Sequence, residues 1–341
     1  MSNTMRVLVY DGPHAFHIEE RPRPEPGPGE VRLRIAFVGI CGSDLHGYTG
    51  ESGRRVPGMV MGHEASGWIE AVGSGVGHLK IGEQVTFNPS LPCGGECGHV
   101  VDNHCTRLQV IGVTPHIQGA FADAAVVPAN RVVPIGDLDL VRGAVVEPMA
   151  VALQATRRVG VGEGDAVVIL GGGMIGQCIA QAARLAGAGS ITVSEGREER
   201  RDLAEAAGFR TVTPDQVPDL ARFDRAFDAV GTTDTAAASI RAVGKGGTVC
   251  FVGLGFPYVT IPLFDVVVSE RSIVGSFCYT DKVFKETVGH IAEGRLNPEP
   301  YLGATERFED IWAAFEDLAT GIRTEVKIMM TTNAAPPEVP T

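Results

Sequence analysis

The feature that most constrains this chain is a glycine-rich segment that directly follows a short apolar run. Residues 167–170 read VVIL, residues 171–176 read GGGMIG, and a helical pattern follows. In a G-x-G-x-x-G pattern the first glycine permits a tight turn, the second lets the backbone approach a pyrophosphate, and the third allows close helix packing. The phosphates would lie at the helix N-terminus, where backbone N–H groups can bind an anion. The segment therefore predicts the first strand, turn and helix of a dinucleotide-binding sheet.

The part of the chain after Glu147 continues this alternation of strands and helices. Strand patterns occupy residues 166–170, 190–194, 226–230, 248–252 and 272–275, and helix patterns occupy residues 174–186 and 198–207. Such alternation is typical of an α/β fold with a doubly wound parallel sheet. We therefore expect a Rossmann domain in this half of the chain.

An acidic residue after the second of these strands bears on the choice of cofactor. Glu195 lies about 20 residues beyond the last glycine of the loop, where a carboxylate can accept hydrogen bonds from the adenosine ribose hydroxyls and repels a 2′-phosphate. It therefore favours NAD over NADP, although Arg197 and Arg200 nearby soften this preference. The cofactor-binding candidates are Gly171, Gly173, Met174, Ile175, Gly176, Glu195 and Arg200.

A second group of residues, much earlier in the chain, carries metal-binding chemistry. Cys41 lies in the turn GICGSD, His63 and Glu64 lie in GHE, and Glu147 lies in the pair EP. A thiolate, an imidazole and carboxylates form the ligand set of a catalytic zinc that keeps one position open for an exchangeable ligand. The first two segments follow breaks at which strands end and a site can open. The pattern predicts a zinc bound by Cys41 and His63, with Glu64 or Glu147 as a further ligand.

Two side chains close to Cys41 are suited to moving a proton. Ser43 lies two residues beyond it, where a hydroxyl can meet the oxygen of a substrate at the metal, and His46 can pass the proton on to water. A Lewis-acid metal beside a hydride acceptor is suited to oxidising alcohols. The catalytic candidates are Ser43, His46, Glu64 and Glu147.

Taken together, these motifs resemble those of the zinc-dependent medium-chain dehydrogenases/reductases of the alcohol dehydrogenase superfamily, and most closely those of its sorbitol and polyol dehydrogenase branch. The resemblance runs over residues 5–330. It implies that Cys41 and His63 bind the catalytic zinc. It also implies that Glu64 and Glu147 approach the metal directly, through water, or by exchange during turnover.

The resemblance further implies how the chain is organised. Ser43 and His46 would relay a proton through the nicotinamide ribose. A β-rich, GroES-like catalytic domain would occupy residues 1–147 and be completed by 277–341, and a Rossmann NAD-binding domain would occupy 148–276. The short alternating apolar runs before Gly136 are typical of such an antiparallel β-rich domain.

Two other segments carry structural expectations. The proline-rich stretch 21–29 is expected to be a surface loop. Near the C-terminus, apolar residues recur at helical spacing and form a stripe that we expect to be buried in the core. The stripe consists of Phe308, Ile311, Trp312, Phe315 and Leu318.

Three of the seven cysteines are clustered in sequence. Cys93, Cys97 and Cys105 follow C-x3-C-x7-C, whereas the resembled family carries C-x2-C-x2-C-x7-C around a structural zinc. His99 or His104 could complete a Cys3His set, which zinc accepts. Because the loop that must wrap the ion is shorter, we expect this lobe to be held by packing and the chain to bind one zinc, the catalytic one.

Composition excludes several kinds of partner. A net charge of −12 argues against nucleic acid or an anionic membrane surface. No apolar run approaches a membrane span, and the N-terminus lacks the apolar core of a signal peptide. A length of 341 residues with 44% hydrophobic content can fill two cores. We expect a cytoplasmic homotetramer or homodimer whose partner is a small-molecule alcohol.

The substrate is less constrained than the reaction. We expect hydride transfer between NAD and a secondary alcohol of a polyol, diol or sugar alcohol. In the polyol branch an Arg-Tyr pair holds substrate hydroxyls, whereas residues 276–279 read SFCY, which leaves Cys278 in the arginine position. Threonine- and sugar-phosphate-type zinc dehydrogenases share these motifs. Two rival functions are a zinc-free reductase of quinones or enones, which would lack the metal ligands, and a non-catalytic nucleotide-binding redox sensor.

Overall fold

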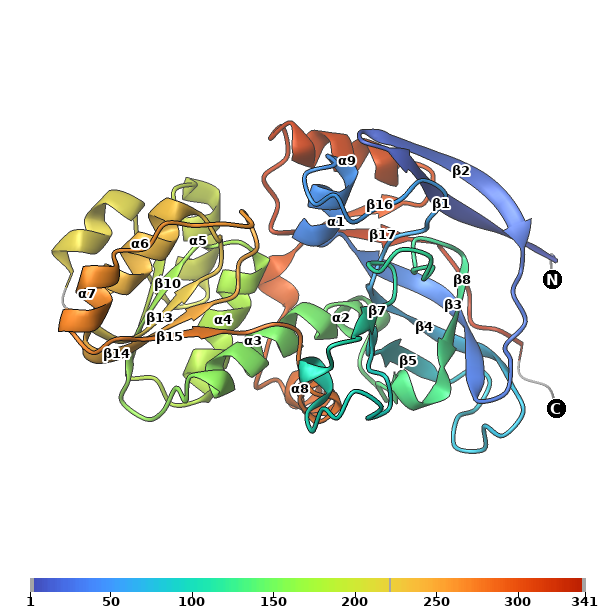
Figure 1. Ribbon diagram of the computed structural model, residues 1–341. Helices are drawn as coiled ribbons and strands as arrows, with labels where there is room; N and C mark the ends of the chain where they lie inside the picture. Colours follow the sequence, from blue (N-terminus) through green and yellow to red (C-terminus); the bar gives the residue numbers. More distant parts are fainter. Residues whose placement is uncertain (1–2, 221, 339–341) are drawn as a thin grey trace. The chain divides into compact units, whose positions relative to one another are not determined.

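The computed structural model describes residues 3–220 and 222–338, which form two compact units (Figure 1). The first unit comprises the residues up to Glu147, Thr280–Ala292 and those from Leu302 on, and the second comprises Pro148–Tyr279 and Glu293–Tyr301. The last of these segments is held by Gln181, whose amide donates to the Tyr301 hydroxyl at 2.7 Å. Across the described residues, every helix is too short or too polar to cross a membrane.

The described part of the second unit is built on a six-stranded parallel sheet. Its strands are β10 (Ala166–Leu170), β11 (Ser190–Ser194), β12 (Arg210–Val212), β13 (Phe223–Asp228), β14 (Val243–Phe251) and β15 (Ser272–Gly275). Their spatial order is β12-β11-β10-β13-β14-β15. The chain thus winds outward from β10 first to one side and then to the other, as in doubly wound dinucleotide-binding folds. The predicted Rossmann sheet is confirmed.

Helices in and next to this unit follow the predicted alternation. They are α3 (Val146–Arg158), α4 (Met174–Leu185), α5 (Glu198–Ala206), α6 (Thr233–Ala242) and α7 (Leu263–Val268), with 3-10 turns η3 (Pro214–Asp219) and η4 (Glu299–Tyr301). Residues 167–170 are almost fully buried, which explains why β10 reads as a continuous apolar run. After Gly173 the chain turns into α4, whose buried alanines allow close packing.

The first unit is dominated by β-structure. Its larger sheet has the order β16-β17-β3-β4-β5-β9, with β8 paired to β3. These strands are β3 (Glu30–Gly39), β4 (Glu64–Val72), β5 (Gln84–Phe87), β8 (Ala124–Pro128), β9 (Val132–Pro134), β16 (Leu302–Arg307) and β17 (Lys327–Thr331). Two smaller antiparallel pairs join β1 (Thr4–Gly12) to β2 (Ala15–Pro22) and β6 (Ser90–Leu91) to β7 (Gln109–Val110).

In the described part of the first unit, the helices range from five residues in α2 to 12 in α8. They are α1 (Gly42–Tyr48), α2 (Leu140–Ala144), α8 (Asp281–Ala292) and α9 (Ile311–Ala319), with 3-10 turns η1 (Asp102–His104) and η2 (Ala129–Arg131). On α9, Ile311 and Phe315 are fully buried, whereas Trp312 is 53% exposed. The prediction that the whole stripe belongs to the core is therefore wrong at Trp312. One residue turns a helix by about 100°, which carries Trp312 away from the face that Ile311 buries.

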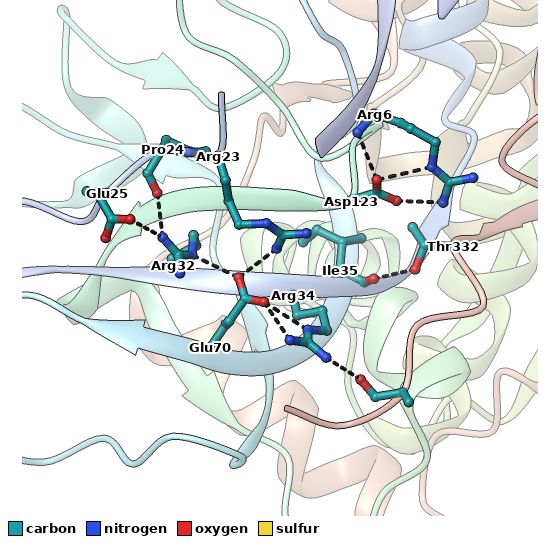
Figure 2. A network of polar contacts seen from close by, with 11 residues as sticks. Arg6, Arg23, Pro24, Glu25, Arg32, Arg34, Ile35, Glu70, Asp123 and Thr332 are labelled. Carbon is teal, nitrogen blue, oxygen red and sulfur yellow. Dashed lines mark hydrogen bonds and ion pairs between the residues drawn. The ribbon is translucent and has the colours of Figure 1, made fainter. Parts of the chain in front are cut away.

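A buried carboxylate holds the proline-rich stretch against the sheet (Figure 2). Glu70 on β4 has a side chain that is 2% exposed, and it pairs with Arg23, Arg32 and Arg34 at 2.7–2.8 Å. Burial raises the pKa of Glu70, but the three guanidinium groups outweigh burial and hold it below its usual value. The expectation of a loop over residues 21–29 is wrong at Arg21 and Pro22, which end β2 and pair with β1. The loop begins at Arg23, which fastens it to the sheet through the ion pair with Glu70.

Candidate metal and cofactor sites

The pairing register of two strands explains why Cys41 and His63 meet. At one end of the antiparallel pair β3·β4, Gly39 lies opposite Glu64. Cys41 follows β3 by two residues and is the N-cap of α1, while His63 directly precedes β4. The two separate segments therefore place Cys41 and His63 at the same end of the β3·β4 strand pair.

The ligand atoms of Cys41, His63 and Glu64 all lie within 4.8 Å of one another. His63 and Glu64 are 5% and 1% exposed, and the buried Oε1 of Glu64 has no hydrogen-bond partner among the described residues. A thiolate, an imidazole and an unsatisfied buried carboxylate oxygen in one small space fit the ligand preferences of zinc. Of the predicted donors, the structure thus brings these three together.

Glu147, the other predicted acidic ligand, does not belong to this group of described residues. It lies in the first turn of α3 and is 9% exposed. Glu147 nevertheless interacts electrostatically with Lys327. Burial disfavours the charged form of this lysine, but Glu64, Cys41 and Glu147 together hold its pKa above the usual value. Glu147 therefore lies within electrostatic range of the cluster and outside its first contacts.

Lys327 is a site residue that the sequence reasoning missed. It lies on β17, its side chain is 2% exposed, and its Nζ is 2.5 Å from Glu64 Oε2 and 2.9 Å from the Ile40 carbonyl oxygen. The ammonium group donates to one oxygen of Glu64, while the other, Oε1, has no hydrogen-bond partner among the described residues. A lysine inside the apolar stretch VKIMM was the available signal, because a buried charge requires a partner.

Asp44 is the second residue that was missed. It is fully buried, its Oδ2 accepts the Cys41 N–H at 3.2 Å, and its Oδ1 lies 3.5 Å from His63 Nδ1. Burial opposes ionisation of Asp44, but His63 and Arg55 outweigh burial and lower its pKa. Burial also lowers the pKa of His63, while Asp44 and Cys41 hold it well above its ordinary value. The negative charges of Asp44 and Cys41 therefore favour a positive charge at His63. A buried carboxylate next to a histidine, such as Asp44, also orients a metal-binding imidazole.

The two relay candidates lie on α1 at i and i+3, which places them on one side of the helix. The Oγ of Ser43 is buried and has no hydrogen-bond partner among the described residues. The side chain of His46 is 38% exposed, with its Nδ1 3.9 Å from Glu51 Oε2. A buried hydroxyl followed by a partly exposed imidazole is an arrangement suited to carrying a proton from an enclosed site to water.

The cysteine lobe contains a second cluster of donors. The ligand atoms of Cys93, Cys97, His99 and Cys105 lie within 4.8 Å of one another. His99 Nδ1 is 3.1 Å from Cys97 Sγ and 3.7 Å from Cys93 Sγ, and Cys97 Sγ is 3.7 Å from Cys105 Sγ. The Thr106 hydroxyl and the His99 imidazole lower the pKa of Cys97 to about 5, which favours the thiolate that binds metals.

This geometry corrects the expectation that the shortened loop fails to gather four donors. Gly94, Gly95 and Gly98 adopt φ values of 69°, 95° and 75°, a left-handed conformation that glycine reaches without strain. The loop therefore turns tightly enough to bring His99 into the set. His104, the other histidine considered, does not belong to this group of described residues.

The glycine loop of the second unit has the geometry that its sequence predicts. Gly171 has φ of 100° and donates its N–H to the Ser194 carbonyl at 2.8 Å. A side chain at Gly176 would strike the backbone of Gly171, and α4 begins with Met174 and Ile175. Above Gly173 the nearest group is the Arg200 guanidinium. The first turn of α4 thus presents its backbone N–H groups as an anion-binding site would.

Glu195 is held against this loop. Its Oε2 accepts the Gly172 N–H at 2.8 Å, its Oε1 accepts the Arg197 N–H at 2.9 Å, and Arg200 Nη1 lies 4.0 Å from Oε2. Burial lowers the pKa of Arg200, and Glu195 partly offsets that effect. The carboxylate is therefore fixed at the end of β11, beside the loop that would carry the pyrophosphate.

Comparison with known protein families gives two matches. Residues 27–137 match the alcohol dehydrogenase GroES-like domain, and residues 174–293 match the zinc-binding dehydrogenase domain. The first match contains Cys41, His63 and the cysteine lobe, and the second begins at the first residue of α4. Together they cover most of both units.

Individual relatives agree with these matches. The 2-dehydro-3-deoxy-L-galactonate 5-dehydrogenase of Pseudoalteromonas atlantica is 32% identical over 325 residues, which cover 91% of this chain and 94% of that protein. D-xylulose reductase A of Aspergillus niger is 30% identical over 335 residues, or 92% and 93% of the two chains. The crystal structure of 2R,3R-butanediol dehydrogenase from Bacillus subtilis is similar with a TM-score of 0.88 and 27% identity, covering 96% of this chain and all of that one.

These matches confirm the resemblance that the GICGSD, GHE and glycine-loop motifs carry. The chain belongs to the zinc-dependent medium-chain dehydrogenases/reductases of the alcohol dehydrogenase superfamily, near the polyol dehydrogenase branch.

Proposed function

We propose that this protein is a zinc-dependent dehydrogenase that transfers a hydride between NAD and a secondary alcohol of a polyol, diol or sugar derivative. The observation that carries the proposal is the cluster of Cys41, His63 and Glu64, with ligand atoms within 4.8 Å and a buried, unsatisfied Glu64 oxygen. An inert structural cluster would satisfy that oxygen internally. A reductase that works without a metal does not require a thiolate, an imidazole and a carboxylate this close together.

Each side chain of the first unit has a role in this proposal. Cys41, His63 and Glu64 would hold the metal, and bound zinc would supply the Lewis acidity that brings the pKa of an alcohol toward neutrality. Lys327 fixes one Glu64 oxygen and leaves the other available. Ser43 accepts the substrate proton at Oγ.

The remaining roles concern the proton and the outer contacts of the ligands. His46 passes the proton from Ser43 to solvent at its exposed imidazole. Asp44, whose Oδ1 lies 3.5 Å from His63 Nδ1, orients this imidazole. Glu147 approaches the site through water or by exchange, consistent with its position outside the cluster. NAD, when bound, would supply the hydride acceptor.

The second unit would bind the cofactor through residues of the loop and the end of β11. Backbone N–H groups from Gly173 to Gly176 would bind the pyrophosphate, and Met174 and Ile175 belong to the first turn of α4, which supplies these groups. Glu195 is fixed where it would accept hydrogen bonds from the ribose hydroxyls. This position favours NAD over NADP. The positive charge of Arg200, 4.0 Å from Glu195, weakens the repulsion of a 2′-phosphate by the carboxylate.

We also propose that the lobe of Cys93, Cys97, His99 and Cys105 binds a second, structural zinc. Four donors of the right types within 4.8 Å support a closed tetrahedral site. The backbone N–H groups of Cys93 and Cys97 already donate to the sulfurs of Cys105 and Cys93, at 3.4 and 3.3 Å. Such donors stabilise thiolates in the arrangement that a metal requires.

Names of the relatives support the substrate class. By these names the relatives act on a deoxy sugar acid, on xylulose and on a vicinal diol. Each of these compounds has a secondary alcohol, or the matching ketone, next to a carbon that carries another oxygen. In this chain Cys278 replaces the arginine of the polyol branch and has φ of 51°. Sorbitol is therefore a weaker candidate than smaller diols or sugar acids, and threonine and phosphorylated sugar alcohols belong on the same list of substrates to test.

We further propose a homodimer or homotetramer that resides in the cytoplasm. β15 is an edge strand of its sheet, and exposed apolar side chains flank it, including Leu263, Phe264, Val267 and Phe277 at 50–76% exposure. An apolar sheet edge of this kind pairs readily with a second copy. The seven cysteines are free, which suits a reducing compartment. For the domains we keep the bounds 1–147 with 277–341, and 148–276, except that we assign residues 277–279 and 293–301 to the Rossmann domain because they belong to its compact unit.

A substrate screen tests the proposed function. Purified protein would be incubated with NAD or NADP and a panel of diols, polyols, sugar acids, threonine and phosphorylated sugar alcohols, and reduced cofactor would be followed by absorbance. We expect turnover with at least one vicinal diol or sugar derivative, a preference for NAD, and loss of activity with a chelator. NAD binding without turnover on any member would favour the redox sensor, and turnover that survives chelation would favour a zinc-free reductase.

A further inference from the structure

A buried arginine packs against α1, the helix that carries the relay residues, and it has no role in the proposed reaction. Arg55 precedes β4, and its side chain is 2% exposed. Its Nη1 donates to the Val113 carbonyl at 3.1 Å, its Nη2 donates to the Ser43 carbonyl at 3.3 Å, and its Nε faces Met61 Sδ at 3.2 Å. A guanidinium remains charged in proteins, so its burial requires a counter-charge.

That counter-charge is Asp44. Arg55 Nη2 lies 3.6 Å from Asp44 Oδ1, and the same oxygen lies 3.5 Å from His63 Nδ1. The other oxygen accepts the Cys41 N–H. One fully buried carboxylate therefore stands between a permanent cation and the imidazole of a proposed ligand. Because outer carboxylates fix the orientation of metal-binding histidines, whatever fixes the carboxylate acts on the ligand too.

Arg55 also packs against the backbone of α1. A Cβ at Gly47 would lie 2.6 Å from Arg55 Cγ, so a side chain at this position would displace the arginine stem. The stem passes under the helix, and the guanidinium reaches the carbonyl of Ser43. Arg55 thus ties together α1, the segment before His63 and the loop at Val113.

We propose that Arg55 is a positioning residue for the zinc site, which orients Asp44 toward His63 and holds the relay helix through the Ser43 carbonyl. It touches neither the metal nor the substrate. The inference rests on the proposed function in one respect, namely that Cys41 and His63 bind zinc. Outer contacts of this kind change metal affinity or activity by about 10–100-fold.

The test uses three variants of the full-length, zinc-loaded protein. Arg55→Met removes the charge at similar length, and Arg55→Lys keeps the charge but cannot reach three acceptors at once. Arg54→Met is the matched control, because Arg54 is the adjacent residue and is exposed. For each, the rate of zinc release to a chromogenic chelator, kcat, and KM for NAD would be measured, with Tm as the reading of fold stability.

We expect Arg55→Met to release zinc about 10–100-fold faster, with a similar loss of kcat and an unchanged KM for NAD. Arg55→Lys should fold, because its ammonium still faces Asp44, and should give an intermediate loss. Arg54→Met should match the wild type. If Arg55→Met fails to fold, Arg55→Lys decides the matter.

A double variant separates positioning through Asp44 from general packing. Asp44→Asn alone should speed zinc release, and adding Arg55→Lys to it should change the rate by less than about 3-fold, because both act on the same contact. Independent, multiplicative effects would overturn the inference, as would Arg55 variants with lowered Tm but wild-type zinc release and kcat. Wild-type protein that binds no zinc at Cys41 would instead overturn the proposed function.

Discussion

Replacing Lys327 by methionine tests whether the buried Glu64 requires a cation beside it. The two side chains are 2% and 1% exposed and 2.5 Å apart. Methionine has a similar length and no charge, so the substitution removes the ion pair with little change in packing. It leaves a buried carboxylate uncompensated. Breaking a buried pair in this way costs about 3–5 kcal/mol.

The expected loss can be converted to a melting temperature. For a unit of about 200 residues, 1 kcal/mol shifts the midpoint by about 2–4 °C. The zinc-free Lys327→Met variant should therefore unfold about 6–20 °C below the wild type. Zinc should restore much of this difference, because a divalent cation beside Glu64 replaces the missing charge and binds the folded state.

Differential scanning calorimetry of zinc-loaded and chelator-treated protein measures both effects. Lys282→Met is the control, since Lys282 lies on α8 of the same unit and is 82% exposed. A melting temperature lowered by less than 2 °C in Lys327→Met would show that buried Glu64 does not need the lysine charge beside it. An equal loss with and without zinc would refute the assignment of Glu64 to the metal site.

Three further predictions concern the lobe, the relay and the cofactor. Elemental analysis should find two zinc equivalents in the wild type and one in His99→Ala; one equivalent in both would show that the lobe is empty. Ser43→Ala should keep its zinc and lose kcat by about 10²–10⁴, and unchanged turnover at pH 7 would make Ser43 a turn residue. Glu195→Ala should lower the ratio of kcat/KM for NAD to kcat/KM for NADP. A wild-type enzyme that prefers NADP would contradict the role proposed for Glu195.

Sequence alone identified the parts of the site whose chemistry is local. The glycine loop is a contiguous motif whose geometry follows from its own backbone, and the confirmed doubly wound parallel sheet follows from strand and helix alternation. Cys41, His63 and Glu64 stood out because their residue types suit zinc. Their meeting depends on the β3·β4 register, which strand-end positions only suggested.

Further parts of the site depend on long-range contacts that no local pattern encodes. Lys327 pairs with Glu64 across 263 residues of sequence, because β17 lies next to β3. In the sequence nothing distinguishes Asp44 and Arg55 from other polar residues; the fold places Asp44 in α1 and buries both side chains near His63. His99 was one of two candidate fourth donors, but the expectation that the shortened loop would not gather four donors was wrong, because loop length alone does not show the left-handed glycines that let the loop turn tightly.

Alcohol oxidation by this protein is expected to require a zinc that Cys41 and His63 hold. Zinc content, NAD binding and alcohol-dependent NAD reduction would be measured on one preparation each of wild type and Cys41→Ser. We predict that Cys41→Ser loses one zinc equivalent and its turnover while NAD still binds the other unit. A Cys41→Ser protein that retained all its zinc and a normal kcat would contradict this expectation.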